Sequence, residues 1–326
     1  MIKPKVFVTR QLPDTGIKML KKCCQVRVYP KDQVIPRKEL LRNVKWADAL
    51  LCLLTDKIDK EVLDANPKLK IVANYAVGYD NIDIKYATQK KIPVTNTPGA
   101  LEHAVAEHTF ALLMSIARRI PESDRFVRAG KYKTWEPLLL MGSELQGKTL
   151  GIVGLGRIGT GVAQRAAKGM GMKVLYYDVK RNEQFERDYD ATYVNMKVLL
   201  KTADFITLHV PLLPSTHHLI GKKELSLMKK TAYLINTSRG PVIDEKALVH
   251  ALRKKQIAGA ALDVYEFEPR LSLGLRALQN VVLTAHTASA TWEARSAMSM
   301  VAAQNILTVL AGKKAPSVVN SEVYSK

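Results

Sequence analysis

The stretch KTLGIVGLGRIG, residues 148–159, decides the fold of the chain around it. Residues 149–153 form an apolar run with the length of a buried strand, and three glycines follow with G-x-G-x-x-G spacing. Gly154 permits a tight turn, Gly156 lets the backbone approach a pyrophosphate, and Gly159 lets the next helix pack on the strand. The stretch therefore predicts a strand, a turn and a helix that bind a dinucleotide.

A helix and a second strand are expected after these glycines. The helix runs from about Ile158 to Gly169, and its N-terminal amides, beside Arg157, point at the phosphates. Residues 173–177 read as the next strand, and Asp178 ends it. An acid about 20 residues beyond the glycines accepts hydrogen bonds from an adenosine ribose. It also repels the 2′-phosphate of NADP, so NAD is the expected cofactor, although Lys180 and Arg181 nearby partly offset that charge. A glycine-rich turn without a ligand would explain only the glycines.

The composition is that of an ordinary globular protein. The 326 residues are 47% hydrophobic and 25% charged, which suits one or two domains. No apolar run approaches the roughly 20 residues of a membrane span, and the chain opens directly on a strand pattern without a signal peptide. The 3 cysteines fit a reducing cytoplasm and predict neither a disulfide framework nor a metal site. We expect a cytoplasmic protein with no membrane partner.

The net charge of +20 raises the alternative of nucleic-acid binding. The basic residues are spread along the chain, without a block of five or six like charges and without an interleaved basic and aromatic patch. A nucleic-acid footprint needs clustered charge as well as total charge. We therefore expect a diffuse basic surface that attracts anions and no nucleic-acid partner.

Short apolar strands alternate with helices along most of the chain. Strands are predicted at residues 5–9, 25–29, 49–54, 70–74, 92–95, 205–209, 232–236, 259–264 and 281–284. Alternation of this length predicts parallel sheets covered by helices on both faces. Residues 101–118 and 291–310 predict two long helices, the first of them apolar on most faces. The fold class is α/β.

Reactive side chains follow three of the predicted strands. In a doubly wound sheet, ligands bind beyond the carboxyl ends of the strands. The loops at these ends contain Arg239, Glu266, Glu268 and His286. A histidine can supply the proton that a ketone needs when a hydride arrives, and a carboxylate on its other ring nitrogen favours the charged form. An arginine can bind a carboxylate bidentately. Each residue alone has an ordinary structural explanation, but together beside a dinucleotide fold they predict an oxidoreductase.

At this point the chain resembles the D-isomer-specific 2-hydroxyacid dehydrogenases, especially their glyoxylate and hydroxypyruvate reductases. The resemblance covers nearly the whole chain and rests on residues 74–81 (NYAVGYDN), 154–159 (GLGRIG), 236–240 (NTSRG), 262–269 (LDVYEFEP), His286 and Ser289. It implies that Arg239, Glu268 and His286 are catalytic. The glutamate of this family directly precedes a proline, which selects Glu268 over Glu266.

The resemblance also implies the binding residues. The amides of Val77 and Gly78 would bind the substrate carboxylate together with Arg239, and Leu54 would line the substrate pocket. Asp263 would hold the nicotinamide amide, and Val210 and Pro211 belong to the adenine loop. The predicted cofactor-binding set is Gly154, Gly156, Arg157, Ile158, Gly159, Asp178, His209, Val210, Pro211, Thr237, Asp263 and Ala288.

Two departures from the family pattern stand near the expected nicotinamide. The family usually reads Pro-His-Ile-Gly-Ser, whereas this chain reads Ala285-His-Thr-Ala-Ser289. Ala288 adds a methyl group where the ring passes. Val105 replaces a threonine that relatives often carry, which removes a hydrogen bond.

The resemblance implies two doubly wound domains and a homodimer. Residues 1–101 and 287–326 would form a flavodoxin-like substrate domain, and residues 102–286 a Rossmann-type nucleotide domain. The expected reaction is reduction of glyoxylate or hydroxypyruvate by NADH, with a small anionic 2-keto acid as the binding partner. Two alternatives stay open: a phosphite or other 2-hydroxyacid dehydrogenase, and a corepressor-like protein that senses NAD. Phosphite dehydrogenases tend to carry lysine where Val77 stands.

Overall fold

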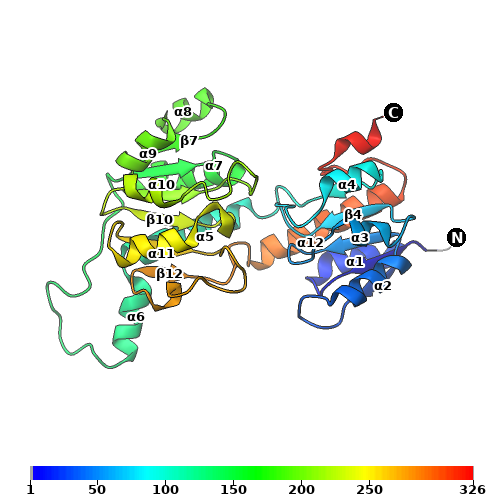
Figure 1. Cartoon of the computed structure of the whole chain (residues 1–326), viewed down its shortest axis with the longest axis horizontal. Helices are drawn as coiled ribbons and strands as arrows, with labels where there is room; N and C mark the ends of the chain where they lie inside the picture. The colour runs from blue at the N-terminus through cyan, green and yellow to red at the C-terminus, as the bar shows by residue number, and fades with distance from the viewer. Residues whose placement is uncertain (1–2, 326) are drawn as a thin grey trace. The chain divides into compact units, whose positions relative to one another are not determined.

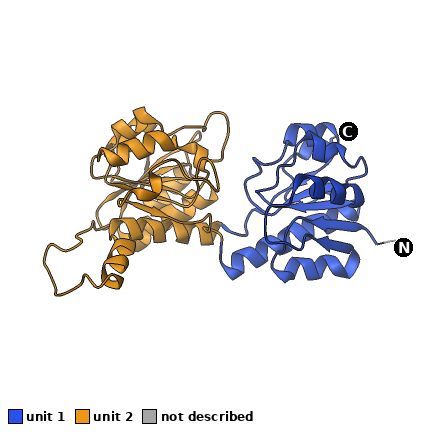
Figure 2. Ribbon diagram, turned by 60° about the horizontal axis from the view of Figure 1, so that its bottom comes forward, with its two compact units in different colours: residues 1–101, 290–326 blue, residues 102–289 orange. Residues whose placement is uncertain are grey.

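The computed structural model describes residues 3–325, which form two compact units (Figures 1 and 2). The first unit, unit 1, consists of Met1–Leu101 and Ala290–Lys326, and the second, unit 2, is Glu102–Ser289. Each unit is built on one sheet in which every pair of neighbouring strands is parallel. The predicted α/β class with two parallel-sheet domains is confirmed.

Unit 1 has a five-stranded sheet in the order β2-β1-β3-β4-β5. This is the flavodoxin-like order, so the prediction for this half is also confirmed. The strands are β1 (Lys5–Val8), β2 (Gln25–Val28), β3 (Ala49–Cys52), β4 (Ile71–Asn74) and β5 (Val94–Thr95). The helices are α1 (Asp14–Cys23), α2 (Arg37–Trp46), α3 (Lys60–Asp64), α4 (Ile84–Gln89), α12 (Trp292–Leu310) and a 3-10 turn, η4 (Ser321–Tyr324). Every residue of β3 and β4 is buried, as their unbroken apolar runs predict.

The C-terminal helix α12 belongs to unit 1 and packs closely on α1. A Cβ atom on Gly16 would lie 2.1 Å from the Ser299 carbonyl oxygen, so only glycine permits this approach. The Gly16 amide also donates to the Ser299 hydroxyl at 3.2 Å. Residues from the two ends of the chain therefore share one core.

Strand β3 ends two residues earlier than the sequence predicts. The buried carboxylate of Asp56 accepts a hydrogen bond from the Leu53 amide at 2.8 Å and another from the Thr9 hydroxyl. The Leu53 amide is therefore not available to the sheet, and the chain turns into a loop at this point.

Unit 2 has a seven-stranded sheet in the order β12-β11-β10-β9-β6-β7-β8. Counted from β6, the first six strands follow the 3-2-1-4-5-6 order of dinucleotide-binding folds. The strands are β6 (Thr149–Val153), β7 (Lys173–Tyr177), β8 (Ala191–Tyr193), β9 (Phe205–Leu208), β10 (Tyr233–Asn236), β11 (Gly259–Leu262) and β12 (Val281–Leu283). The helices are α5 (Glu102–Ala117), α6 (Ile120–Arg128), α7 (Arg157–Gln164), α8 (Glu183–Tyr189), α9 (Met196–Thr202), α10 (Lys222–Leu227) and α11 (Glu245–Arg253). Three shorter turns are η1 (Arg165–Gly169), η2 (Gly240–Val242) and η3 (Leu275–Ala277), of which η1 is π-helical and prolongs α7.

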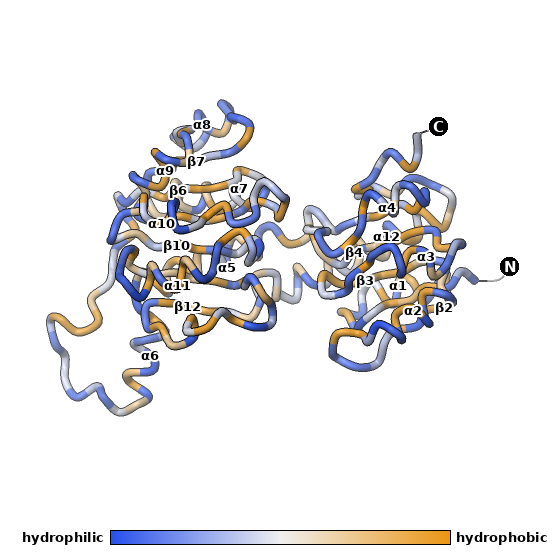
Figure 3. Tube along the Cα trace, in the orientation of Figure 1, coloured by the Kyte–Doolittle hydropathy of each residue, from blue (hydrophilic) through white to orange (hydrophobic). Residues whose placement is uncertain are grey.

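Helix α5 packs on one face of this sheet, against one half of its strands. It contacts β10, β11 and β12, and nine of its residues are buried, which agrees with its apolar faces. Beyond α6 the chain leaves the sheet as a projecting loop (Figure 1). Figure 3 shows hydrophobic stretches along the strands and again in this loop.

Three short elements escaped the sequence prediction: α4, α8 and β8. Helix α8 (EQFERDY) buries only Phe185 and begins because the Asn182 side chain accepts from the Phe185 amide at 3.0 Å. Phe185 packs edge-on against Tyr176 of β7. Because a seven-residue polar helix has almost no apolar periodicity, this tertiary contact and the cap decide its position.

No helix within residues 3–325 is long and apolar enough to cross a membrane.

Candidate active site

The glycine-rich turn connects β6 with α7. Gly154 has φ of +95°, which a residue with a side chain rarely adopts. A Cβ on Gly159 would lie 2.1 Å from the Gly154 carbonyl oxygen. A Cβ on Gly156, just before α7, would meet no other described atom within 4 Å. Local packing explains Gly154 and Gly159, whereas the space beside Gly156 at the helix N-terminus fits a phosphate.

Asp178 follows β7, and its carboxylate turns back toward the glycine turn. Its Oδ2 accepts a hydrogen bond from the Leu155 amide at 2.6 Å. The neighbouring Gly154 amide donates to the Tyr177 carbonyl at 2.9 Å. The acid therefore lies beside the turn, where a ribose hydroxyl of a bound dinucleotide is expected.

Arg181, three residues beyond, is held away from this carboxylate by Glu186. Its Nε and Nη2 donate to the two Glu186 oxygens at 2.9 and 2.7 Å. The Tyr176 hydroxyl also donates to Glu186, at 2.8 Å. The hydrogen bonds from Arg181 and Tyr176 lower the pKa of Glu186 to about 2, so the carboxylate is ionised at neutral pH. Of the two basic residues expected to offset Asp178, Arg181 is therefore already paired with another acid.

The loop after β9 contacts the glycine turn. The His209 amide donates to the Val153 carbonyl at 2.8 Å. A Cβ on Gly154 would lie 2.9 Å from the His209 carbonyl carbon. Burial lowers the pKa of His209 to about 3, so the ring is neutral, and its buried Nε2 meets no partner within residues 3–325. Val210 and Pro211 continue this loop.

Strand β10 leads directly into the loop that contains Arg239. The buried Asn236 folds this loop on itself, because its Nδ2 donates to the Arg239 carbonyl at 2.9 Å and its Oδ1 accepts from the Ser238 amide at 3.0 Å. One guanidinium nitrogen of Arg239 donates to the Ser238 carbonyl at 3.0 Å. The Thr237 hydroxyl lies 2.9 Å from the hydroxyl of Thr109 on α5.

His286 and Glu268 form a hydrogen-bonded pair. His286 Nδ1 lies 3.0 Å from Glu268 Oε2, while Glu268 Oε1 accepts from the Tyr265 amide at 3.0 Å. Burial alone would raise the pKa of Glu268, but the hydrogen bond and charge of His286 lower it below its usual range. A Cβ on Gly240 would lie 1.9 Å from the Tyr265 carbonyl oxygen, so the Arg239 loop touches the Glu268 loop backbone to backbone. The structure thus brings Arg239, Glu268 and His286 to neighbouring strand ends.

Glu266, two residues earlier, has different partners. Its Oε1 lies 2.8 Å from His218 Nε2, and its Oε2 accepts from the Glu245 amide at the start of α11 at 3.0 Å. Its carboxylate therefore stabilises a helix N-terminus and an exposed histidine. It makes no contact with His286.

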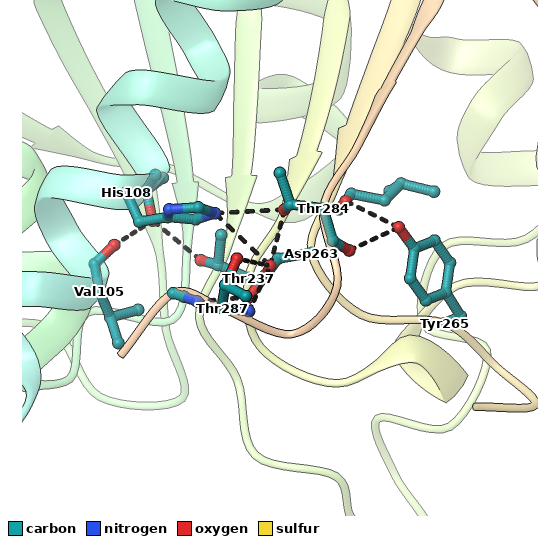
Figure 4. A network of polar contacts seen from close by, with 10 residues as sticks. Val105, His108, Thr237, Asp263, Tyr265, Thr284 and Thr287 are labelled. Atoms are coloured by element: carbon teal, nitrogen blue, oxygen red, sulfur yellow. Dashed lines mark hydrogen bonds and ion pairs between the residues drawn. The ribbon is translucent and has the colours of Figure 1, made fainter. Parts of the chain in front are cut away.

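Asp263 anchors the segment that carries His286 (Figure 4). Its fully buried carboxylate accepts from the Thr284 hydroxyl at 2.6 Å, the Thr287 amide at 2.8 Å and the Ala288 amide at 2.8 Å. The Asp263 carbonyl accepts from the His286 amide at 2.8 Å. Burial would raise the pKa of Asp263, but hydrogen bonds from His108, from Thr284 and from the amides of Thr287 and Ala288 lower it to about 2. The side chain that was expected to hold the nicotinamide amide is thus bonded to its own loop.

Sequence reasoning passed over His108, Thr284 and Tyr265. His108 Nε2 lies 3.2 Å from Thr284 Oγ1 and 3.5 Å from Asp263 Oδ1. The Tyr265 hydroxyl donates to the Thr284 carbonyl at 2.7 Å. On the same helix the Val105 carbonyl accepts from a threonine hydroxyl at 2.8 Å. The available signal was the polar pair of residues 108–109 beside the apolar run of residues 110–114 in the same helix.

In unit 1, the loop after β4 contains two unpaired backbone amides. Asn96 Nδ2 donates to the Val77 carbonyl and Asn74 Nδ2 to the Gly78 carbonyl, each at 2.8 Å. Within residues 3–325, neither the Val77 nor the Gly78 amide donates a hydrogen bond. Two successive free amides suit an anion such as a carboxylate.

Leu54 lies in the loop after β3 of the same unit and is half-buried. Asn81 Nδ2 donates to the carbonyls of Leu53 and Asp56 at 3.0 Å each. These bonds attach the loop of Leu54 to the loop of Gly78. Among the described residues, no group of three His, Cys, Asp or Glu side chains is arranged to hold a metal ion.

Comparison with known proteins identifies the family. Residues 110–288 match the family described as D-isomer specific 2-hydroxyacid dehydrogenase, NAD binding domain. A glyoxylate reductase of Thermococcus litoralis is 52% identical over 328 aligned residues, which cover 99% of each chain. A crystal structure of a Thermus thermophilus protein is 42% identical with a TM-score of 0.91, over 97% of this chain and 99% of that one.

A further solved structure is an NADPH-dependent glyoxylate/hydroxypyruvate reductase from Sinorhizobium meliloti, in complex with NADP and malonate. It is 29% identical with a TM-score of 0.84, over 98% of each chain. The match in sequence over the whole length and the match in fold lead to one conclusion. The chain belongs to the D-isomer specific 2-hydroxyacid dehydrogenases.

Proposed function

We propose that this protein reduces small 2-keto acids with NADH, glyoxylate first and hydroxypyruvate second. The observation that carries the proposal is the pair of His286 Nδ1 and Glu268 Oε2 at 3.0 Å, which leaves the other ring nitrogen for a substrate. The similarity to a named glyoxylate reductase supports the choice of substrate class.

His286 acts as the general acid in this proposal. NADH, when bound, supplies the hydride that reduces the carbonyl carbon. His286 donates the proton to the carbonyl oxygen from Nε2, and the ionised Glu268 stabilises the imidazolium before transfer. Arg239 binds the substrate carboxylate and polarises the carbonyl, and the amides of Val77 and Gly78 are further proposed carboxylate-binding groups. In the reverse direction His286 is the base.

Unit 2 is the nucleotide domain and unit 1 the substrate domain in this proposal. Gly156, Arg157 and Ile158 would hold the pyrophosphate at the start of α7, where the open space beside Gly156 supports that assignment. Asp178 would bind the ribose and favour NADH over NADPH. Thr237 and Ala288 would line the nicotinamide.

Substrate choice depends on the walls around the reacting group. Arg239 and the two amides accept any 2-keto acid, so selectivity comes from apolar side chains such as Leu54. A methylene in such a pocket is worth only about 1–3 kcal/mol, so the preference is graded and pyruvate reacts more weakly. Chiral products have the D configuration.

We further propose a homodimer in the cytoplasm. Helix α6 buries none of its residues, and the following loop exposes Trp135 and Leu138 by 75% each and Met141 by 61%. An apolar surface of this kind suits association with a second copy. Light scattering on the wild type and on Leu138→Ser tests the dimer: the wild type should have twice the mass of one chain, and a monomeric wild type would contradict it. The unpaired thiols of Cys23, Cys24 and Cys52 support a reducing compartment.

Steady-state kinetics test the function. Catalytic efficiency is measured with NADH and glyoxylate, hydroxypyruvate, pyruvate, phenylpyruvate and 2-ketogluconate, and with NAD and phosphite. The highest value is expected with glyoxylate. A phenylpyruvate or phosphite rate well above that with glyoxylate would replace the substrate assignment. No turnover with any of them would contradict the enzyme itself and favour a protein that only senses NAD.

A further inference from the structure

A histidine outside the proposed catalytic set lies behind the His286 segment. His108 projects from α5 toward the carboxyl ends of β11 and β12, where Asp263 and Thr284 lie (Figure 4). Its side chain is 22% exposed, whereas Asp263 is fully buried. His108 therefore contacts a carboxylate that is itself shielded from solvent.

The hydrogen-bond inventory determines what His108 does there. Thr284 has one hydroxyl proton, and at 2.6 Å that proton is donated to Asp263 Oδ1. The Thr284 oxygen can then only accept from His108 Nε2, which lies 3.2 Å away. The ring therefore carries a proton on Nε2. The same N–H lies 3.5 Å from Asp263 Oδ1 and helps to compensate the buried charge.

Asp263 connects His108 to the segment 286–288, which contains the proposed catalytic histidine. Its carboxylate binds the amides of Thr287 and Ala288, both at 2.8 Å, and its carbonyl binds the amide of His286, also at 2.8 Å. His286 itself has φ of +54°, in the left-handed region. A residue with a side chain persists there only where its surroundings hold it. The angle of the catalytic ring thus depends on the atoms that hold Asp263.

We propose that His108 is a positioning residue: by donating from Nε2 to Thr284 and Asp263 it orients the segment 286–288 and with it the His286 ring. The inference rests on the proposed function, in which His286 is the general acid. His108 is not among the residues proposed to contact the substrate, so in this proposal it affects the reaction only through Thr284 and Asp263.

Two substitutions distinguish the effect of the His108 hydrogen-bond donor from the effect of its side-chain volume. In His108→Gln the amide nitrogen takes the place of Nε2 and can still donate, whereas His108→Leu fills the space without a donor. His103→Gln is the matched control, because His103 lies on the same helix, is exposed and makes no described contact. Small displacements of a catalytic group reduce turnover strongly.

The expected result is a split between turnover and binding. His108→Leu should lower kcat for glyoxylate on the order of tenfold, with the KM for glyoxylate and the Kd for NADH within about twofold of wild type. His108→Gln should keep kcat within about threefold, and His103→Gln should match wild type. If His108→Leu keeps wild-type kcat, or if the leucine and glutamine variants lose turnover equally, His108 is not a positioning donor. Equal thermal unfolding midpoints in all three variants exclude general destabilisation as the cause.

A spectroscopic measurement tests the proposal independently of turnover. Long-range proton–nitrogen NMR of protein labelled in histidine should show a proton on His108 Nε2. A bare Nε2 with the proton on Nδ1 would overturn the inference. This result stands even if the wild type reduces no 2-keto acid, in which case only the proposed function fails.

Discussion

The two units present their functional groups in opposite ways. In unit 2, the proposed catalytic side chains lie at the strand ends, and buried side chains such as Asp263 and Asn236 restrain the backbone beneath them. In unit 1, asparagine side chains bind the carbonyls of Val77 and Gly78, while the amides of these residues donate no hydrogen bond within residues 3–325 and are the proposed ligand-binding groups. The same kind of parallel sheet thus offers side chains in one unit and backbone in the other.

This difference predicts different kinetic effects of mutation. Changes in His286 and its partner Glu268 of unit 2 should act on turnover, because these side chains act on a proton that moves only in the transition state. Changes in the supports of unit 1 should act on substrate affinity, because a carboxylate is bound equally before and during the reaction. Substitutions in each unit can break or sharpen this contrast.

The largest effect is expected from His286→Ala. Removal of a positioned general acid should lower kcat for glyoxylate by on the order of a hundredfold or more, while NADH binding persists. Stopped-flow or steady-state NADH oxidation measures the loss. His218→Ala is the control, since His218 pairs with Glu266 and makes no contact with His286. A His286→Ala variant with more than about a tenth of wild-type turnover would contradict its role as the acid.

The fold was predictable because its determinants are local. Gly154 is required by its own backbone angle, φ of +95°, and Gly159 by its contact with the Gly154 carbonyl five residues earlier, so their spacing alone indicates the turn. The unbroken apolar runs of β3 and β4 similarly indicate strands covered on both faces. Helix α8 escaped because its position depends on Phe185 meeting Tyr176, a contact that its own polar sequence does not indicate.

The candidate site was only partly predictable, because most of its contacts join residues far apart in the sequence. Loop residues have no periodicity, so nothing local separates Glu266 from Glu268, and only the proline motif of the family did so. The structure gives the two acids separate partners, His218 and His286. His108 escaped because its contact with Asp263 joins residues 155 positions apart across the crossing of α5 and the sheet. Such a contact follows from packing and not from spacing.

The second prediction concerns Glu268→Gln. Protonated His286 loses its anionic partner, and a hydrogen bond to a charged group is worth about 1.5–3 kcal/mol, so efficiency at neutral pH should fall about tenfold or more. Because reduction needs the protonated ring, the pH profile should also move toward lower pH. Rates measured across the pH range give this shift.

Glu266→Gln is the matched control for Glu268→Gln. Glu266 is an acid of the same loop, but its partners are His218 and the start of α11, so the profile should stay in place. If Glu266→Gln shifts the profile and Glu268→Gln does not, the partner assignment is reversed.

The third prediction tests cofactor choice through Asp178 and Glu186. Asp178→Ser removes the charge that repels a 2′-phosphate, worth about 1 kcal/mol at contact distance in water, so the NADPH to NADH efficiency ratio should rise about fivefold. Arg181 stays paired with Glu186 in that variant. Adding Glu186→Gln frees the guanidinium, and the ratio should rise again by a similar factor. A double variant equal to Asp178→Ser would show that Arg181 does not reach the cofactor.

The smallest effect is expected in unit 1, from Asn96→Ala. Asn96 Nδ2 donates to the Val77 carbonyl at 2.8 Å, and the backbone carbonyl of Asn96 accepts from Asn305 of α12 at 3.1 Å. The substitution removes only the first of these bonds. The peptide between Val77 and Gly78 is then less restrained, but its amides remain. A neutral hydrogen bond contributes about 0.5–1.5 kcal/mol net, so the KM for glyoxylate should rise about threefold while kcat stays within twofold of wild type. Gln304→Ala is the control, because this exposed residue of α12 bonds only within its own helix. A fall in kcat as large as the rise in KM would mean that unit 1 also acts in the transition state, and the contrast between backbone and side-chain units would then not hold.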